Sequence, residues 1–214
     1  AGTVEDGDSN TESGDKDDPF LAETENCNLT YAAICSRYFG ADFNLVSHSG
    51  QGIARNYDDF GQGYHMPDRY SQTFDNSKEI IWNAAEAAYT PDVVVIYLCT
   101  NDFSTGRQPQ EEVFVGRYIE LMKKVKANYG EEIPILCMAS NVTPFSFDYI
   151  RMACMMSGLK NVYCLGLTKG VHNYEDELGA SWHPNYKGHI KVASCMIPYI
   201  STLTGWEMEE KPYK

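Results

Sequence analysis

The sequence lacks several features that would assign it directly to a class of proteins. Its longest apolar run, Val93–Cys99, is far shorter than the roughly 18 residues of a membrane-spanning helix. Its first residues contain neither the basic start nor the apolar stretch of a secretory signal peptide. Basic residues are scarce, since 17 Lys and Arg accompany 30 Asp and Glu, for a net charge of −13. This charge argues against nucleic acid or an acidic membrane as partner, because both need a basic face.

Recognisable metal-binding patterns are also missing. The five histidines are scattered without ligand spacing, and none of the seven cysteines forms a C-x-x-C pair. Several cysteines lie in apolar segments, which predicts small buried side chains that stay reduced. We therefore expect no metal and no cofactor, together with a reducing compartment or an anaerobic habitat.

The composition is that of one ordinary globular domain. The 214 residues are 43% hydrophobic and 22% charged, which argues against a disordered or fibrous chain. The charge is uneven, because residues 1–26 carry nine acids and one lysine. We expect a single domain over residues 1–214, with an irregular acidic segment at 1–26 and a C-terminal tail at 204–214.

Apolar periodicity predicts alternating strands and helices. Helices are expected at 30–39, 78–88, 110–128, 147–157 and 186–203. Strands are expected at 43–47, 93–98, 133–138 and 162–165. The continuous apolar character of 93–98 is typical of a strand buried on both faces. The alternation favours a three-layer, doubly wound parallel α/β sheet, in which ligands bind at the carboxyl ends of the strands.

Three short clusters near predicted strand ends contain candidate functional groups. The glycines of 49–52 can point backbone N–H groups into a site, although taken alone a simple turn explains them better. Asn101 can donate its amide to a developing oxyanion, or it can form an Asx-turn or a helix cap. His183, before the last helix, lies where an imidazole is accessible and titrates near neutrality; a plain surface histidine is the alternative.

The order of these clusters resembles the SGNH/GDSL hydrolase superfamily, and more narrowly carbohydrate esterase family 2, whose members remove acetyl groups from plant-wall polysaccharides. The resemblance spans residues 1 to about 203 and is carried by TENCNLTYAAI (24–34), SGQGIARNYDD (49–59), LCTNDFS (98–104) and SWHPNYKGH (181–189). It implies a flavodoxin-like SGNH hydrolase fold and a serine esterase that needs no cofactor.

The resemblance also implies a role for individual residues. His183 matches the general base that takes the proton of the serine. The carboxylate that usually orients this base is absent, so the main-chain carbonyl of Trp182 would orient it in a Ser–His dyad. Gly50 matches the backbone oxyanion donor, with Gly52 as the nearby alternative. Asn101 matches the side-chain oxyanion donor.

The position of the nucleophile is less direct. The family places its serine in a GDSIT-like motif after the first strand, and the sequence GDSNT at 7–11 matches such a block literally. However, residues 1–6 form no apolar strand, and they resemble the residues that follow the family's motif. We therefore expect the serine and the first strand upstream of Ala1, in a separate chain or in preceding residues, and we favour this over Ser9. A sheet of order 2-1-3-4-5 without that central strand would leave two inner edges unpaired.

The function implied by the resemblance is removal of O-acetyl groups from carbohydrate of the xylan or glucomannan type, by a protein exported from the cell. The aromatic residues of 57–70, with Trp182, are candidates for stacking sugar rings, although ordinary packing explains at least half of them. Two alternatives stay open. One is another GDSL-type acyl hydrolase, such as a lipase or thioesterase, and the other is a non-catalytic carbohydrate-binding fragment.

Overall fold

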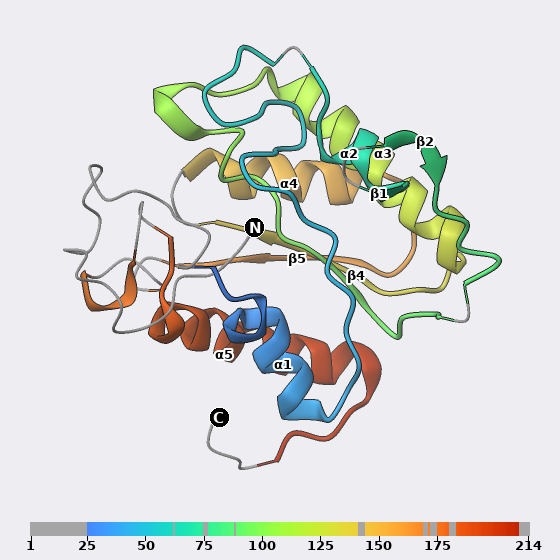
Figure 1. The fold of residues 1–214 in the computed structure, drawn as a ribbon, viewed down its shortest axis with the longest axis vertical. Helices are drawn as coiled ribbons and strands as arrows, with labels where there is room; N and C mark the ends of the chain where they lie inside the picture. Colours follow the sequence, from blue (N-terminus) through green and yellow to red (C-terminus); the bar gives the residue numbers. More distant parts are fainter. Residues whose placement is uncertain are drawn as a thin grey trace. The chain divides into compact units, whose positions relative to one another are not determined.

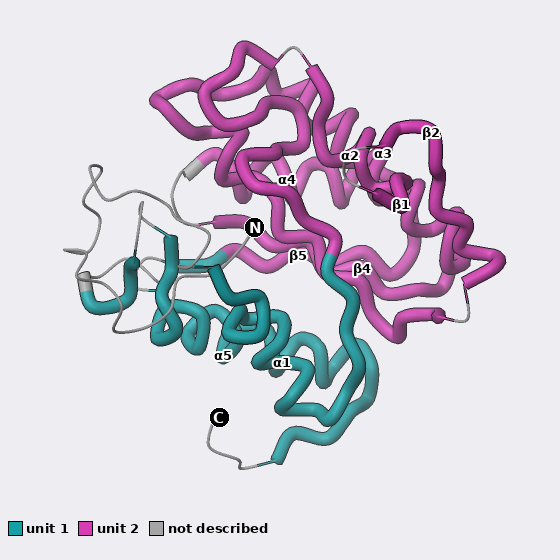
Figure 2. Tube along the Cα trace, in the orientation of Figure 1, with its two compact units in different colours: residues 1–45, 167–214 teal, residues 46–166 magenta. Residues whose placement is uncertain are grey.

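The structure is a computed structural model of the chain, and it describes residues 25–61, 63–74, 77–87, 89–140, 144–168, 171, 175–179 and 183–209. The chain divides into two compact units, formed by residues 46–166 and by residues 1–45 with 167–214 (Figure 2). Most of the expected acidic segment 1–26 lies outside the described residues, as does Ser9. Among the described helices, none has the length and apolar character needed to span a membrane.

The larger unit, 46–166, is built on a parallel sheet of three strands in the order β3-β4-β5. Its strands are β3 (Val94–Ile96), β4 (Ile135–Ala139) and β5 (Val162–Gly166). Figure 1 labels β4 and β5 of this sheet. All five residues of the central strand β4 are buried, as expected for an apolar strand of a parallel sheet. Within the described residues, β3 pairs along one edge only, with β4. The predicted parallel strands 93–98, 133–138 and 162–165 are therefore confirmed, with shifted ends.

Two long helices complete the core of this unit. α3 (Glu111–Tyr129) packs against α4 (Pro144–Met156), and α4 contacts both β4 and β5. Both helices were predicted. Their apolar faces bury a continuous cluster that includes Phe114, Tyr118, Met122 and Val125 of α3, Ile135 and Cys137 of β4, and Ile150 and Ala153 of α4.

The segment before β3 folds differently from its prediction. A single helical turn, α2 (Met66–Arg69), leads into an antiparallel hairpin of β1 (Gln72–Phe74) and β2 (Ser77–Ile81). The helix predicted at 78–88 is therefore wrong. Ile80 and Ile81 are β-branched and therefore suit a strand. The segment pairs with β1 and is extended, whereas the sequence pattern alone suggested a helix.

The strand predicted at 43–47 is also wrong. Residues 41–48 adopt no regular secondary structure, and the side chains of Phe43, Leu45 and Val46 are 42%, 41% and 55% exposed. A strand is held by hydrogen bonds to a neighbouring strand, and none of the described strands pairs with this segment. The apolar sequence is present here, but the partner that would make it a strand is not among the described residues.

The smaller unit, 1–45 with 167–214, is based on two packed helices, and both were predicted. α1 (Tyr31–Phe39) contacts α5 (Tyr186–Thr204), and α1 ends at Gly40, whose φ of 64° lies in the left-handed region. Buried side chains at this contact include Ala33 and Ile34 of α1 and Val192 and Met196 of α5. His189 of α5 is buried, and its Nδ1 accepts a hydrogen bond from the backbone N–H of Tyr31 at 3.3 Å.

Candidate active site

The turn that contains the predicted backbone donor lies at residues 49–52 of the larger unit. Gly50 has a φ of 74°, which glycine adopts without steric cost. Its carbonyl oxygen accepts a hydrogen bond from the N–H of Tyr57 at 2.8 Å. The N–H of Gly50 donates no hydrogen bond within the described part of the chain, and the residue is half-buried. This N–H is therefore available to an acceptor on a ligand.

Gly52, the alternative donor, is held on both sides. Its N–H donates to Oδ1 of Asn56 at 3.2 Å, and its carbonyl oxygen accepts from the N–H of Met66 at 2.9 Å. A Cβ at this position would lie 2.0 Å from the carbonyl oxygen of Arg55 and 2.5 Å from Oδ2 of Asp102. Glycine is therefore required here for close packing, and its N–H is already in use.

Asp102 anchors the glycine-containing loop from the turn that follows β3. Its side chain is fully buried, and its carboxylate accepts hydrogen bonds from the backbone N–H groups of Ile53, Ala54 and Arg55 at 2.7 to 3.1 Å. Burial raises the pKa of Asp102 to about 6, and the three donated N–H groups oppose that rise. The carboxylate thus fixes the loop that follows Gly52 against the turn after β3.

Arg55 fastens the same two segments with its guanidinium group. This side chain is buried, and it donates to the carbonyl oxygens of Asp59, Asp102 and Ser104 at 2.7, 2.8 and 3.0 Å and to the hydroxyl of Thr105 at 2.7 Å. The sequence reasoning assigned no role to Asp102 or Arg55. The available signal was a single arginine inside a glycine-containing loop, since a buried guanidinium needs several acceptors nearby.

Asn101 lies beside Asp102 and is half-buried. Its Nδ2 donates to the carbonyl oxygen of Gln51 at 2.9 Å. A primary amide has two N–H groups, and the second donates no hydrogen bond within the described residues. The structure therefore brings the Asn101 amide next to the turn that contains Gly50, and each has an N–H group that makes no hydrogen bond within the described residues.

His183 lies in the smaller unit, directly before α5, and is half-buried. Its carbonyl oxygen accepts from the N–H of Gly179 at 2.8 Å, and the N–H of Asn185 donates to the carbonyl oxygen of Glu177 at 2.9 Å. These two hydrogen bonds pair the segment that contains His183 with the segment before it. The backbone from the carbonyl of His183 to Asn185 is thereby held in place.

Asn185 joins this paired segment to α5. Its Oδ1 accepts from the N–H of Gly188 at 3.2 Å, which caps the first turn of the helix. Its Nδ2 donates to the carbonyl oxygens of Asp176 at 3.0 Å and Leu178 at 3.3 Å. The asparagine of the HPN sequence therefore has a structural function, because it begins the helix and holds the loop in front of His183.

The remaining sequence-based expectations are only partly covered by the structure. Trp182, the predicted orienting residue, lies outside the described residues, as does Ser9. Among the described residues, no group of three or more His, Cys, Asp or Glu side chains is arranged to hold a metal ion. All seven cysteines are free thiols, of which Cys35, Cys99 and Cys137 are buried and Cys27 is exposed.

A family model and two curated proteins are similar to the chain. The model described as GDSL-like Lipase/Acylhydrolase matches residues 7–196. The cellulase/esterase CelE of Acetivibrio thermocellus is 31% identical over 200 residues, which cover 89% of this chain and 24% of that protein. An acetylxylan esterase/glucomannan deacetylase of Cellvibrio japonicus is 24% identical over 205 residues, which cover 88% of this chain and 53% of that protein. The chain thus spans about a quarter and about half of the length of these relatives.

Solved structures give the same picture of the fold. A family two carbohydrate esterase from Clostridium thermocellum, in complex with cellohexaose, is 31% identical with a TM-score of 0.78 and covers 92% of this chain and 60% of its own. A family two carbohydrate esterase from Cellvibrio japonicus has a TM-score of 0.76 at 18% identity, covering 95% of this chain and 61% of its own. The second likeness concerns the fold alone. Together they confirm the predicted flavodoxin-like α/β class.

Proposed function

The chain belongs to the GDSL-like lipase/acylhydrolase family, and we propose that it is a serine esterase that removes O-acetyl groups from plant-wall carbohydrate of the xylan or glucomannan type. The names of its relatives, an esterase and an acetylxylan esterase/glucomannan deacetylase, support this substrate class. The observation that carries the proposal is the pair of unused donors on Gly50 and Asn101, joined through the carbonyl of Gln51. Ester hydrolysis through a serine needs such donors where the carbonyl oxygen becomes an oxyanion.

In this mechanism His183 takes the proton of the serine hydroxyl while the serine oxygen attacks the acetyl carbon. The carbonyl oxygen becomes negative and accepts hydrogen bonds from the N–H of Gly50 and the amide of Asn101. The C–O bond to the sugar then breaks, and the sugar oxygen receives the proton from His183. A water molecule, deprotonated by the same imidazole, then attacks the acetyl carbon. The bond to the serine oxygen breaks, the serine takes the proton back from His183, and acetate leaves. Gly50 is the proposed backbone donor because the N–H of Gly52 already donates to Asn56.

We propose that the main-chain carbonyl of Trp182 orients His183 in the absence of a carboxylate. A carbonyl can fix the tautomer of the imidazole, although it stabilises the imidazolium less than a carboxylate does. The hydrogen bond from the N–H of Gly179 to the carbonyl oxygen of His183 supports this arrangement, because it holds the backbone of the residue that the Trp182 carbonyl would orient.

We propose that the nucleophilic serine is supplied by an additional strand, from an upstream segment or a second chain, with Ser9 as the alternative. Two features of the described residues support an additional strand. β3 is paired along one edge only, and residues 41–48 carry exposed apolar side chains without strand pairing. Unpaired strand edges inside a sheet are costly, and the carboxyl end of a neighbouring strand is where a nucleophile of this fold is held. Because the proposed polymer cannot enter a cell, the protein would act outside it.

Acetate release from acetylated xylan by the intact protein tests this function. We expect Asn101→Ala to lower kcat about 100-fold or more with little change in KM, because the donor acts mainly on the oxyanion. His183→Ala should lower kcat by about 1,000-fold or more. Lys160→Ala, at a side chain that is 76% exposed, is the control and should be neutral.

Two results would contradict the proposal. One is an Asn101→Ala variant with unchanged kcat. The other is faster hydrolysis of a medium-chain acyl ester than of the acetyl ester, which would favour the lipase or thioesterase alternative.

A further inference from the structure

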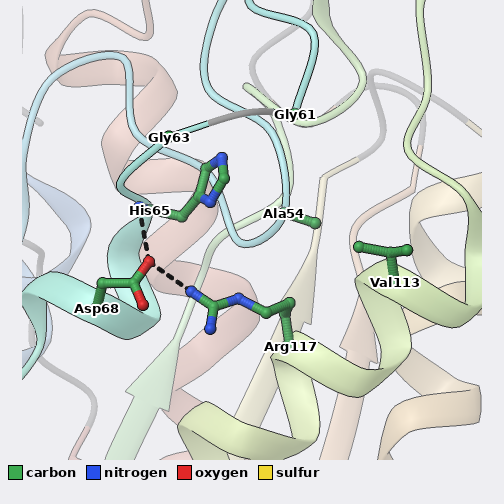
Figure 3. Close-up of a pocket in the computed structure, with 7 residues that line it drawn as sticks. All are labelled: Ala54, Gly61, Gly63, His65, Asp68, Val113 and Arg117. Carbon is green, nitrogen blue, oxygen red and sulfur yellow. Dashed lines mark hydrogen bonds and ion pairs between the residues drawn. The ribbon is translucent and has the colours of Figure 1, made fainter.

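A cavity of about 290 Å³ lies in the larger unit, beside α3 and the loop that precedes α2. Its lining consists of Ala54, Gly61, Gly63, His65, Asp68, Val113 and Arg117 (Figure 3). None of these residues has a role in the acyl-transfer steps described above. The volume suits a ligand of the size of one sugar ring rather than a longer acyl chain.

A network of ion pairs forms one wall of the cavity. Arg117 donates to Oδ2 of Asp68 and to Oε2 of Glu120, at 2.5 Å in each case. Glu120 also pairs with Lys124 at 2.9 Å, and Oδ2 of Asp68 accepts from the backbone N–H of His65 at 3.0 Å. Of these four charged residues the lining contains Arg117 and Asp68, one cation and one carboxylate, so it carries no excess charge that would favour an ionic ligand.

His65 supplies a ring nitrogen without a hydrogen-bond partner. The residue is 5% exposed, and its Nε2 makes no hydrogen bond within the described structure. The backbone N–H of Asp68 donates to the carbonyl oxygen of His65 at 2.9 Å. In a neutral imidazole Nε2 either donates or accepts, according to the tautomer. Burial lowers the pKa of His65, which keeps the ring neutral near pH 7.

The position of the ring relative to the rest of the lining is visible in Figure 3. The imidazole stands on the side of Gly61, Gly63 and Ala54, whereas Asp68 and Arg117 meet below it. Ala54 and Val113 add aliphatic surface to the same cavity. Polar groups that are placed at one side of an otherwise aliphatic or open lining are typical of sites for small polar ligands.

We propose that this cavity binds a neutral sugar residue of the polysaccharide backbone. One sugar hydroxyl forms a hydrogen bond with Nε2 of His65, as acceptor or donor according to the tautomer, and a second hydroxyl donates to the carboxylate of Asp68. The inference rests on the proposed function, since it names the place where the sugar backbone, as distinct from its acetyl group, is bound. The loop supports this link, because the N–H of Ala54 is anchored on Asp102, which also positions the turn containing Gly50.

Calorimetric titration of the intact protein with unacetylated xylotriose, and separately with cellotriose, tests the site without any catalytic step. His65→Asn places a residue suited to begin a helix at this position but removes Nε2. Val113→Phe fills the cavity from a position that is 46% exposed. We expect each variant to weaken trisaccharide binding about 10-fold, or about 1.4 kcal/mol.

Met155→Phe is the matched control, because it places the same ring at a position of α4 that is 74% exposed and outside the cavity. It should leave trisaccharide binding unchanged. If His65→Asn lowers the unfolding temperature, Val113→Phe alone decides the test. On acetylated xylan, the cavity variants should raise KM about 10-fold while kcat changes less than about twofold, as expected for lost ground-state binding.

The possible results separate this proposal from the proposed function. Wild-type protein that binds neither trisaccharide, or variants that bind as tightly as wild type, would overturn the sugar site even if esterase activity is present. Binding that is lost in both variants, in a protein without esterase activity, would support the sugar site and overturn the proposed reaction.

Discussion

The two stretches of chain that contain the proposed oxyanion donors both end in a turn, but only one of them begins with a paired strand. Asn101 follows β3, which is paired in register with the buried strand β4. Gly50 follows residues 41–48, which form no strand in the described structure. Both turns are nevertheless well defined, and they are joined by the bond from Asn101 to Gln51. In this protein, the conformation of each turn and the strand pairing of the segment before it therefore have separate causes.

The turns are held by a set of buried hydrogen bonds between side chains and the backbone. The carboxylate of Asp102 accepts from three backbone N–H groups, and the guanidinium of Arg55 donates to four carbonyl oxygens. A strand, by contrast, is held by pairing with a neighbouring strand, and residues 41–48 pair with none of the described strands. Side-chain anchors can thus hold a turn in place even where the segment before it pairs with none of the described strands.

The largest expected effect comes from removing the main anchor of the turns. Asp102→Ala would leave three buried backbone N–H groups without an acceptor, at about 1–3 kcal/mol each, so we expect a loss of about 4 kcal/mol or more in unfolding free energy. Asp102→Asn retains one oxygen and should lose less. Urea denaturation measures both.

The control for this comparison is Asp148→Ala, which removes an exposed carboxylate that lies 3.8 Å from Arg151. Exposed ion pairs contribute little, so this variant should lose less than about 0.5 kcal/mol. Equal losses in Asp102→Ala and Asp148→Ala would show that the carboxylate of Asp102 does not hold the turns.

A smaller effect separates the two glycines of the first turn. Alanine at 52 would place Cβ 2.0 Å from a carbonyl oxygen, whereas alanine at 50 meets only Cβ of Tyr57 at 3.9 Å. We expect Gly52→Ala to cost about 3 kcal/mol through overpacking and Gly50→Ala about 1 kcal/mol through its positive φ. Thermal unfolding measures the difference. A larger loss for Gly50→Ala would mean that the close approach at Gly52 is relieved without cost.

Much of the fold was readable from the sequence, for reasons that particular elements make clear. β4, β5, α3, α4 and α5 have strong apolar patterns, and each finds its partner among the described residues. The helix predicted at 78–88 failed because Ile80 and Ile81 pair as a strand with Gln72–Phe74, a contact that local pattern cannot reveal. The prediction of a strand at 43–47 was wrong because an apolar pattern does not show whether a neighbouring strand is there to pair with it.

The proximity of two candidate segments was also readable from the sequence. The order of motifs along the chain predicted that the turn at 49–52 and Asn101 belong together, because both follow predicted strands of one sheet. The anchoring by Asp102 was not readable, since its partners lie almost fifty positions away and a buried carboxylate has no local signature. Nor did the sequence show that the N–H of Gly52 is taken by Asn56 while that of Gly50 is not.

The smallest expected effect tests whether residues 41–48 lack only a partner. Val46 is 55% exposed, so Val46→Asp in the 214-residue chain should change the unfolding free energy by less than about 0.5 kcal/mol. Ile96→Asp, at a buried position of the paired strand β3, should cost several-fold more. When the proposed additional strand is supplied, Val46 becomes part of a paired strand, and the cost of Val46→Asp should rise to about 2 kcal/mol. Denaturation with and without the upstream polypeptide makes this comparison. A cost for Val46→Asp that stays the same in both forms would show that the added polypeptide does not complete the sheet beside this segment.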